Sequence, residues 1–313
     1  MKINLTLLKD LYQIPHPSGQ EYAMLSYIIN YCYKIDNITF EIDHYGNLFI
    51  NKNTNNLKYV PCLVAHMDSV FDWNDDVGLI ITDTQIHAIN KKTKQRCGIG
   101  CDDANGIYVA LHLLRQVDDL KVVFTVEEEV GAIGAREATY NLSFFKNVAY
   151  FLQADRRGSS DLIVHTNGMD VASTEFLSDL ESICEKFKYK HEWGTFTDVG
   201  ELVEELEISG VNISCGYKNE HTSKEHTVIK DLENCLNFIY TIIKTLKDKQ
   251  YKHTPSSYGK YVYHYPQTSS KSTKTTFSEN PNDYEYPYYN DSLAEHCSEC
   301  KDFDCMNCKW YNS

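Results

Sequence analysis

An apolar run followed by three consecutive carboxylates occupies residues 122–135, Val122-Val123-Phe124-Thr125-Val126-Glu127-Glu128-Glu129-Val130-Gly131-Ala132-Ile133-Gly134-Ala135. The β-branched and aromatic residues at its start predict a buried strand. In an open α/β sheet, binding sites lie beyond the carboxyl ends of the strands, which is where the three glutamates would stand. A solvated acidic turn at the start of a helix is the alternative interpretation, since a helix N-terminus favours negative charge. The rest of the chain decides between the two.

Length and charge limit the class of protein. The 313-residue chain can bury one large core and leaves too little for a second ordinary domain. Its net charge of −14 argues against nucleic acid and anionic membranes as partners, because both would be repelled. No apolar run approaches the ~20 residues that cross a bilayer, and the N-terminal residues lack the order of a signal peptide. We therefore expect a soluble protein of the cytoplasm.

The cysteines divide into two groups. Seven of the 11 occur singly in apolar contexts, which indicates reduced thiols in the core rather than a disulfide scaffold: Cys32, Cys62, Cys97, Cys101, Cys184, Cys215 and Cys235. The other four form two Cys-x-x-Cys pairs near the end of the chain, Cys297 with Cys300 and Cys305 with Cys308. Four thiolates suit a structural zinc ion, here in a compact knuckle. A flexible terminus with free thiols is the open alternative.

Strand-like and helix-like segments alternate along most of the chain, which predicts an α/β fold with three α/β/α layers and a mostly parallel central sheet. We expect buried strands near residues 60–65, 122–126, 148–152 and 211–215, and helices near 5–12, 21–33, 107–114, 175–187 and 231–246. A hairpin is expected at 38–50 and a strand pair at 78–90. Asp198 is expected to cap a further helix. Residues 1–250 would form a single catalytic domain, followed by a polar linker at 251–294 and a Cys-rich tail at 295–313.

Polar residues follow the predicted strands at several points: His66, Asp102, Glu128, Glu129, Asp155 and His221. In the extended segment His66-Met67-Asp68, positions i and i+2 face the same side, so Asp68 can orient a metal-binding His66 through its other ring nitrogen. Asp102 and Asp103 precede a helix that needs only one capping acid. The second acid fits a carboxylate shared between two ions ~3.5–4 Å apart. Two histidines with carboxylates suit zinc or a similar divalent ion.

Five ordered segments resemble the motif set of the two-zinc exopeptidase superfamily: Ala65-His66-Met67-Asp68, 100–106, 125–131, Ala154-Asp155 and 219–225. That superfamily includes peptidase T, the glutamyl aminopeptidases, the Aeromonas-type leucyl aminopeptidase and the aminoacylases. The residues of these motifs are most similar to those of peptidase T. Residues 17–21 and Tyr45-Gly46-Asn47 also resemble segments of that group. The resemblance covers residues 5 to about 247.

The resemblance implies a role for each strand-end residue. Asp102 would bridge two metal ions. His66 and Asp155 would complete one metal site, and Glu129 and His221 the other. Glu128 would act as the general base, and Asp68 would orient His66. The triple glutamate leaves a one-residue ambiguity, with Glu127 placed outside the functional pair.

The chain departs from peptidase T in having no room for a lid domain. Only 65 residues separate Asp155 from His221, and only 35 separate His66 from Asp102, where the glutamyl type carries its insertion. The layout therefore looks like the single-domain Aeromonas type, and a lid-mediated dimer is not expected. Any catalytic group that a lid would contribute must be replaced or absent. Three residues that could stabilise an oxyanion are Tyr217, His165 and His226.

The resemblance implies an exopeptidase that hydrolyses short peptides, as an aminopeptidase or a di- or tripeptidase. It would use two divalent ions, zinc or alternatively cobalt or manganese, with a possible third, structural zinc in the tail. The same constellation would also serve a deacylase or amidase of N-acyl amino acids, because the reacting bond is again an amide. An inactive metal-stabilised binding protein is the alternative of another class, although inactive relatives usually lose the base or a ligand first.

Overall fold

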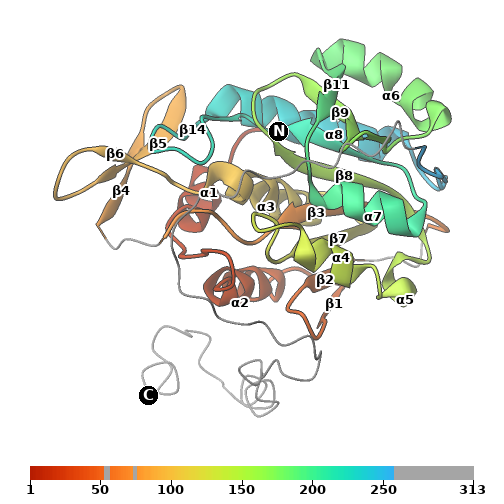
Figure 1. Ribbon diagram of the computed structural model, residues 1–313, viewed down its shortest axis with the longest axis horizontal. Helices are drawn as coiled ribbons and strands as arrows, with labels where there is room; N and C mark the ends of the chain where they lie inside the picture. The colour runs from red at the N-terminus through yellow and green to blue at the C-terminus, as the bar shows by residue number, and fades with distance from the viewer. Residues whose placement is uncertain (53–56, 73–75, 257–313) are drawn as a thin grey trace, which may run out of the picture. The chain divides into compact units, whose positions relative to one another are not determined.

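A computed structural model describes residues 1–52, 57–72 and 76–256. Its centre is a sheet with helices on both faces, as Figure 1 shows, so the predicted three-layer α/β/α arrangement is confirmed. The sheet has nine strands: β1 (Ile38–Ile42), β2 (Leu48–Lys52), β3 (Val60–His66), β7 (Leu120–Thr125), β8 (Val148–Arg156), β9 (Asp161–Thr166), β10 (Met169–Asp170), β11 (Lys190–Gly194) and β12 (Gly210–Ser214).

The middle of this sheet is parallel and its margins are antiparallel. The strand order is β1-β2-β7-β3-β8-β12-β9-β10, with β11 paired to β9. Strands β7, β3, β8 and β12 run parallel to one another. The predicted hairpin forms β1 and β2 and joins β7 antiparallel. Because the four parallel strands all end at one edge, the residues that follow them are brought together there.

Eight helices complete the described fold: α1 (Leu5–Leu11), α2 (Tyr22–Cys32), α3 (Cys101–Leu114), α4 (Ile133–Ala138), α5 (Leu142–Phe145), α6 (Thr174–Phe187), α7 (Asp198–Leu206) and α8 (Ile229–Thr245). Side chains from α1, α2, α3, α6 and α8 form one apolar layer with the sheet. Side chains from α4, α5 and α7 form the layer on the other face.

Strand β3 shows why a parallel strand that is covered on both faces appears as a continuous apolar run. Leu63 and Ala65 belong to the first apolar layer, whereas Cys62 and Val64 belong to the second. Since helices cover both faces, neither set of alternating side chains meets water, and every residue of β3 is buried. The run ends at His66, the first polar side chain after six apolar positions. The change from apolar to polar therefore marks the edge of the sheet.

A second, smaller sheet stands where the sequence has no room for a lid domain. Its strands are β4 (Val77–Ile81), β5 (Gln85–Asn90), β6 (Arg96–Cys97), β13 (Tyr217–Lys218) and β14 (His226–Val228). The first three lie between His66 and Asp102, and the last two flank the loop that contains His221. The short insertion is thus a small sheet tied to the end of β12, and its strands β4 and β5 form the pair that the sequence predicts.

The packed part of the chain continues past the predicted boundary at residue 250. Tyr251 is 1% exposed, its N–H donates to Ala149 O at 2.9 Å, and its hydroxyl donates to Asp179 at 2.7 Å. A large buried aromatic with a satisfied hydroxyl anchors this segment to the domain. The rest of the predicted linker and the Cys-rich tail, at residues 257–313, lie outside the described residues.

The seven scattered cysteines are free thiols, six of them buried and Cys97 half-buried, as the sequence predicts. Burial raises the pKa of Cys62 and Cys32 to about 12. Such thiols stay protonated and act as small apolar side chains. Among the described helices, none is long and apolar enough to cross a membrane.

Candidate metal centre

Parallel strand pairing brings the predicted ligands to one edge of the sheet. His66 at the end of β3 lies level with Thr125 at the end of β7, and the acidic loop begins two residues after Thr125. Asp155 lies near the end of the adjacent strand β8. The first turn of α3 faces the same edge and supplies Asp102. Residues far apart in the sequence thereby meet beyond three neighbouring strand ends.

His66 is 1% exposed and uses its two ring nitrogens differently. Nε2 lies 3.1 Å from Asp102 Oδ1 and 3.6 Å from Asp155 Oδ1, with Glu128 Oε2 at 4.0 Å. Nδ1 lies 3.2 Å from Asp68 Oδ1 on the opposite side of the ring. This is the arrangement expected from the His-x-Asp spacing, in which one nitrogen is available to a metal and a carboxylate orients the other.

Asp102 stands between the two histidines. Its Oδ1 lies 3.1 Å from His66 Nε2, and its Oδ2 lies 3.4 Å from His221 Nε2. The backbone angles of Asp102 and Asp103 are not helical, so α3 is kinked in its first turn. A carboxylate with each oxygen directed at a different imidazole has the geometry of a ligand shared between two ions.

The second histidine pairs with the third glutamate. His221 Nε2 lies 3.0 Å from Glu129 Oε2, and the His221 side chain is 48% exposed. Hydrogen bonds to Asp102 and then Glu129 raise the pKa of His221 to about 10. The cluster therefore divides into His66 with Asp155 on one side of Asp102, and Glu129 with His221 on the other.

Asp68 connects the histidine to the acidic loop. Its Oδ1 accepts from the Glu128 N–H at 2.9 Å, and its Oδ2 accepts from the Glu129 N–H at 3.1 Å and from Ser18 Oγ at 2.7 Å. Burial acts to raise the pKa of Asp68, but hydrogen bonds from His66 and these donors outweigh it and lower the pKa. A carboxylate with this many donors is ionised and fixed in place.

The three glutamates point in different directions. The Glu127 carboxylate accepts from the Tyr45 hydroxyl at 2.5 Å, and Glu127 has a positive φ of 53°. Glu128 is 7% exposed, and its carboxylate is the one that comes within 4.0 Å of His66 Nε2. The chain thus turns at Glu127, which sends its side chain away from the cluster and the next two toward it. Glu128 and Glu129, rather than Glu127, therefore contact the histidines of the cluster.

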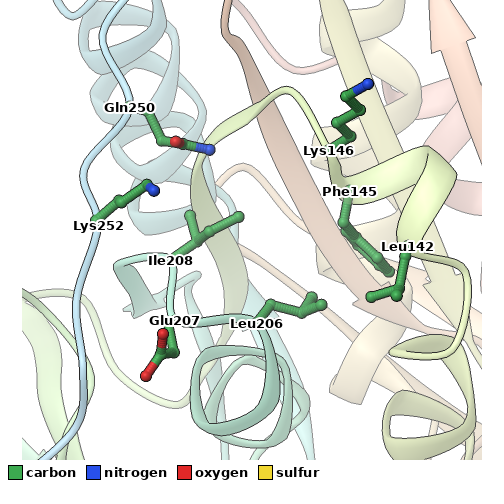
Figure 2. A pocket seen from close by; sticks show the side chains of 8 residues that line it. All are labelled: Leu142, Phe145, Lys146, Leu206, Glu207, Ile208, Gln250 and Lys252. Atoms are coloured by element: carbon green, nitrogen blue, oxygen red, sulfur yellow. The ribbon is translucent and has the colours of Figure 1, made fainter.

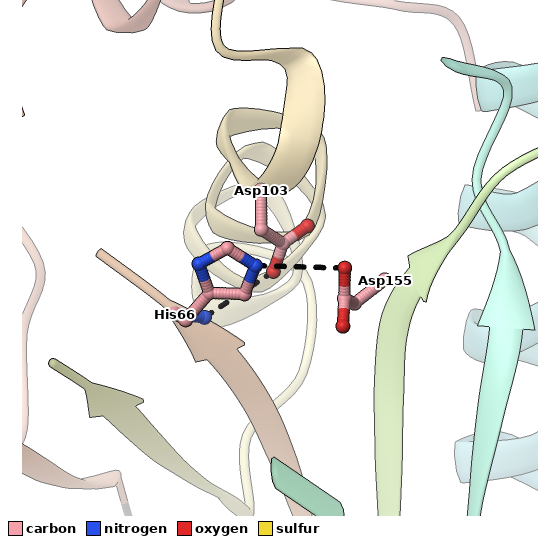
Figure 3. A group of neighbouring side chains, drawn as sticks. All are labelled: His66, Asp103 and Asp155. Atoms are coloured by element: carbon pink, nitrogen blue, oxygen red, sulfur yellow. Dashed lines mark hydrogen bonds and ion pairs between the residues drawn. The ribbon is translucent and has the colours of Figure 1, made fainter. Parts of the chain in front are cut away.

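Asp103 is a second buried acid beside the cluster. Figure 3 shows it with His66 and Asp155, and these three side chains can offer ligand atoms within 4.8 Å of one another, as can His66, Asp102 and Glu129. The oxygens of Asp103, however, accept from the His66 N–H at 3.3 Å and from the Gly106 N–H at 2.8 Å. The bond from the backbone of His66 ties β3 to α3, and the bond from Gly106 lies within α3. We therefore assign Asp103 to the scaffold and Asp102 to the centre.

The three predicted oxyanion-stabilising residues lie in different places. The Tyr217 hydroxyl donates to Asp155 Oδ1 at 3.2 Å and is buried. His165 stacks on Trp193 with ring centroids 4.2 Å apart. His226 pairs across the small sheet with His87. Of the three, Tyr217 is the one with a hydrogen bond to a residue of the cluster.

Glu225 is a buried acid near the cluster that the sequence did not predict to support it. Glu225 accepts from the N–H groups of Ile99 at 2.9 Å and Gly100 at 2.8 Å, which holds the loop that leads into Asp102. Burial raises the pKa of Glu225 to about 7. The sequence shows Glu225 only as the fourth residue after His221, and nothing in that spacing indicates a loop-holding carboxylate.

The prediction that Asp198 caps a helix is wrong. Thr197 occupies the N-cap position of α7, and Asp198 is the first residue of the helix. The Asp198 carboxylate accepts from Thr125 Oγ1 at 2.5 Å and is fully buried. The tertiary hydrogen bond replaces the local one because α7 packs against the end of β7.

Crowded carboxylates give the metal-free centre an unfavourable electrostatic energy. Burial raises the pKa of Glu128 and Glu129, and burial with the nearby Asp102 raises that of Asp155 to about 8. Like charges close together in a desolvated site disfavour ionisation of the whole group. Bound cations would relieve this repulsion, and the oxygen and imidazole donors present are those that zinc and similar ions take.

A pocket of about 600 Å³, including its open mouth, lies at the other end of the sheet (Figure 2). Its walls include Phe145, just before β8 begins, and Ile208, just before β12 begins. It therefore lies by the amino ends of the parallel strands, whereas the predicted ligands lie at the carboxyl ends. Chemistry in this fold belongs at the carboxyl ends, so the ligand cluster is the candidate site.

Comparison with known protein families identifies the family of this chain. The model of the M42 glutamyl aminopeptidase family matches residues 76–238, just over half of the chain. The chain belongs to this family. Membership makes the chain a metal-dependent peptidase of the exopeptidase type and confirms the predicted superfamily. The matched segment contains Asp102, Glu128, Glu129, Asp155 and His221.

Solved structures share the fold of this M42 member. A tripeptidase from Staphylococcus aureus has a TM-score of 0.63 and 15% identity over 77% of this chain and 96% of its own. The aminopeptidase PepT from Bacillus cereus has a TM-score of 0.62 and 13% identity over 77% and 97%. The TET1 peptidase of Pyrococcus horikoshii has a TM-score of 0.59 and 16% identity over 76% and 98%. At such identities the likeness shows the fold alone. No curated protein matches the chain.

Proposed function

We propose that the chain is a two-metal exopeptidase that removes residues from the ends of short peptides, with Glu128 as its general base. The observation that carries this proposal is the position of Asp102, whose two carboxylate oxygens are directed at His66 and His221. Membership of a peptidase family supports the reaction class, and the cluster supports the number of ions. Zinc is the proposed metal because the donors are imidazole and carboxylate.

In this proposal His66 and Asp155 would hold one ion, Glu129 and His221 would hold the other, and Asp102 would be shared. When bound, the ions would supply a Lewis acid for the scissile carbonyl and would lower the pKa of water so that it is a nucleophile near neutral pH. Glu128 accepts the proton of the attacking water and returns it to the leaving amine. Burial raises the pKa of Glu128 above its usual range.

Neighbouring side chains support these roles by orientation. Asp68 fixes the ring of His66 and, through the Glu128 and Glu129 N–H groups, the loop that carries the base. The Tyr217 hydroxyl beside Asp155 is proposed to steady the developing oxyanion or the ligand itself. The 48% exposure of the His221 side chain marks the side on which a peptide enters.

We further propose that the enzyme works in the cytoplasm without a lid-mediated dimer. The free buried thiols support a reducing compartment. The small sheet of β4, β5 and β6 occupies the segment between His66 and Asp102, which leaves no separate lid domain there.

The test is metal removal and reloading. Protein freed of metal with a chelator should lose activity toward a panel of dipeptides, tripeptides and aminoacyl anilides, and zinc, cobalt or manganese should restore it at about two ions per chain. Full activity at one ion per chain would exclude the two-metal proposal. Cleavage of N-acyl amino acids in preference to peptides would show that the protein is a deacylase instead.

A further inference from the structure

The two oxygens of the Asp155 carboxylate have different surroundings. Oδ1 lies 3.6 Å from His66 Nε2 and accepts from the Tyr217 hydroxyl at 3.2 Å. Oδ2 accepts from Gln153 Nε2 at 3.0 Å, and the Thr197 hydroxyl lies 3.3 Å from it. Oδ1 is therefore the oxygen beside the first metal-binding histidine, whereas Oδ2 is contacted by two uncharged polar groups.

Gln153 is a fully buried polar side chain within strand β8. It is 0% exposed and lies two residues before Asp155, so the two side chains stand on the same face of the strand. Burial of an amide is unfavourable unless its polar atoms are hydrogen-bonded. Packing alone favours an apolar residue at this position, so the reason for an amide lies in its hydrogen bonds.

The orientation of the Gln153 amide is fixed by the start of α7. Its Oε1 accepts from the Val199 N–H at 2.7 Å and from the Thr197 hydroxyl at 2.8 Å. A backbone N–H can only donate, so the atom that faces Val199 must be the amide oxygen. The amide nitrogen is thereby turned toward Asp155 Oδ2, and Gln153 connects the start of α7 to this carboxylate.

A neutral donor suits a carboxylate that has to bind a cation. A lysine or arginine in place of Gln153 would also bond to Asp155, but its charge would repel a divalent ion. The amide carries no net charge, so it orients the carboxylate and leaves the negative charge of Asp155 available to the ion. Hydrogen-bond partners of metal ligands commonly fix the orientation of those ligands in this way.

We propose that Gln153 is a positioning residue for the metal ion on the His66 side of the centre, where it holds Asp155 by Oδ2 so that Asp155 binds the ion through Oδ1 alone. This inference rests on the two-metal function proposed above. Asn212 holds the backbone of the same ligand, because it accepts from the Asp155 N–H at 3.0 Å and donates to the Asp155 carbonyl at 2.7 Å. Both the backbone and the side chain of Asp155 are thus fixed before an ion binds.

The test is the zinc affinity of protein that lacks the other metal site. His221→Ala removes a proposed ligand of the second ion, and zinc is titrated into this metal-free protein in competition with a chromophoric chelator. Gln153→Met keeps the length of the side chain but removes its hydrogen bonds, and it should weaken zinc binding by about tenfold to a hundredfold. With cobalt in place of zinc, the visible absorption of this variant should also change, because Asp155 is then free to bind through both oxygens.

A double-mutant cycle separates positioning from a structural role. Without the Asp155 carboxylate, Gln153 has no ligand to hold, so Gln153→Met should leave zinc affinity unchanged in an Asp155→Ala background, measured against a weaker chelator. A loss of the same size in both backgrounds would show that Gln153 acts through the fold. That result, or no loss in either background, would overturn the proposal.

Thr197→Val replaces Gln153→Met if the latter does not fold. It removes the hydroxyl that contacts both Gln153 and Asp155, and Thr197 has no side-chain hydrogen bond that caps α7. Zinc should bind several-fold more weakly in this variant when Asp155 is present and equally well when Asp155 is alanine. An unchanged zinc affinity in the presence of Asp155 would contradict the proposal.

Ser209 provides a matched control. It is a buried side chain whose Oγ accepts from a backbone N–H at the start of α6, that of Ser173, at 3.1 Å. Ser209→Ala therefore removes a comparable bond between a strand and a helix, away from Asp155, and should leave zinc affinity as in the parent protein. A loss as large as that of Gln153→Met would make the effect a general one and the proposal wrong.

Zinc affinity is measured without a substrate, which separates this inference from the proposed function. Coupling between Gln153 and Asp155 in zinc binding supports the inference even if the wild type hydrolyses no peptide. Peptide hydrolysis with two ions per chain, together with a zinc affinity that Gln153→Met does not change, would overturn the inference and leave the proposed function intact.

Discussion

The two sides of the metal centre are built differently. On one side, the His66 side chain is 1% exposed and extends from the end of a central strand. On the other, His221 lies in the loop between β13 and β14, has a positive φ of 59°, and its side chain is 48% exposed. The first histidine is placed by the sheet itself. The second depends on local contacts of a loop, among them the neighbouring Arg157–Glu220 pair.

The difference indicates that the two sides of the proposed two-metal site are not equally preorganised. A buried ligand in one rotamer loses little freedom when an ion binds, whereas an exposed loop ligand loses more. We therefore expect the ion on the His66 side to bind more tightly than the ion on the His221 side. The exposed side is also where substrate has access, so weaker binding there accompanies an open coordination position.

The largest effect should come from removing the group common to both sides. Asp102→Ala deletes the carboxylate that lies between His66 and His221, which leaves two cations close together with less negative charge between them. We expect fewer than two ions per chain by elemental analysis and no measurable peptide hydrolysis. Retention of two tightly bound ions would contradict the shared role of Asp102.

A large effect without loss of metal should come from Glu128. Glu128→Gln removes the proposed proton acceptor but keeps the size of the side chain, so turnover should fall by about 10²- to 10⁴-fold while both ions remain. Glu127→Gln is the matched control, since the Glu127 carboxylate is bonded to Tyr45. If Glu127→Gln proves to be the crippling change, the assignment within the triple is off by one residue.

The smallest expected effect is on the number of protons released when metal binds on the His221 side of the centre. With its pKa raised to about 10, His221 is protonated at pH 7 in the metal-free protein and must lose that proton to bind an ion. Below pH 10, deprotonation of His221 should therefore make the apparent affinity for the ion on the His221 side rise by about tenfold for each unit of increasing pH. His221→Ala should release one proton fewer on zinc loading, measured by calorimetry in buffers of different ionisation enthalpy. An unchanged proton count would place the exposed ligand elsewhere.

The sequence predicts those parts of the fold that rest on runs of apolar residues. Strand β3 is buried along its whole length and appears in the sequence as an unbroken apolar run that ends at His66. Strands β7, β8 and β12 are almost wholly buried as well, although Lys121, Gln153 and Asn212 stand within them. The structure brings His66 and Asp155, at the ends of β3 and β8, together with Glu128, which follows β7. Strand β11 was not predicted because four of its five residues are exposed and it carries no apolar pattern.

Contacts between distant segments could not be predicted from one sequence. Glu225 is bonded to Ile99, and Asp198 is bonded to Thr125, yet local patterns describe only neighbours in the chain. The ion pair of Arg157 with Glu220 has the same origin, since the position of Arg157 two residues after Asp155 does not indicate Glu220 as its partner. Such tertiary contacts override local preferences at Asp198, where the expected cap became a buried partner of a strand.

The contacts of Ser18 and Glu225 also set when the enzyme becomes active during its synthesis. Ser18 bonds to Asp68 near the start of the chain, and Glu225 holds the segment before Asp102 from a position 207 residues later. Pairings of such long range cannot form while the later segment is still inside the ribosome. A nascent chain therefore cannot complete the contacts around the candidate centre until Glu225 has left the ribosome.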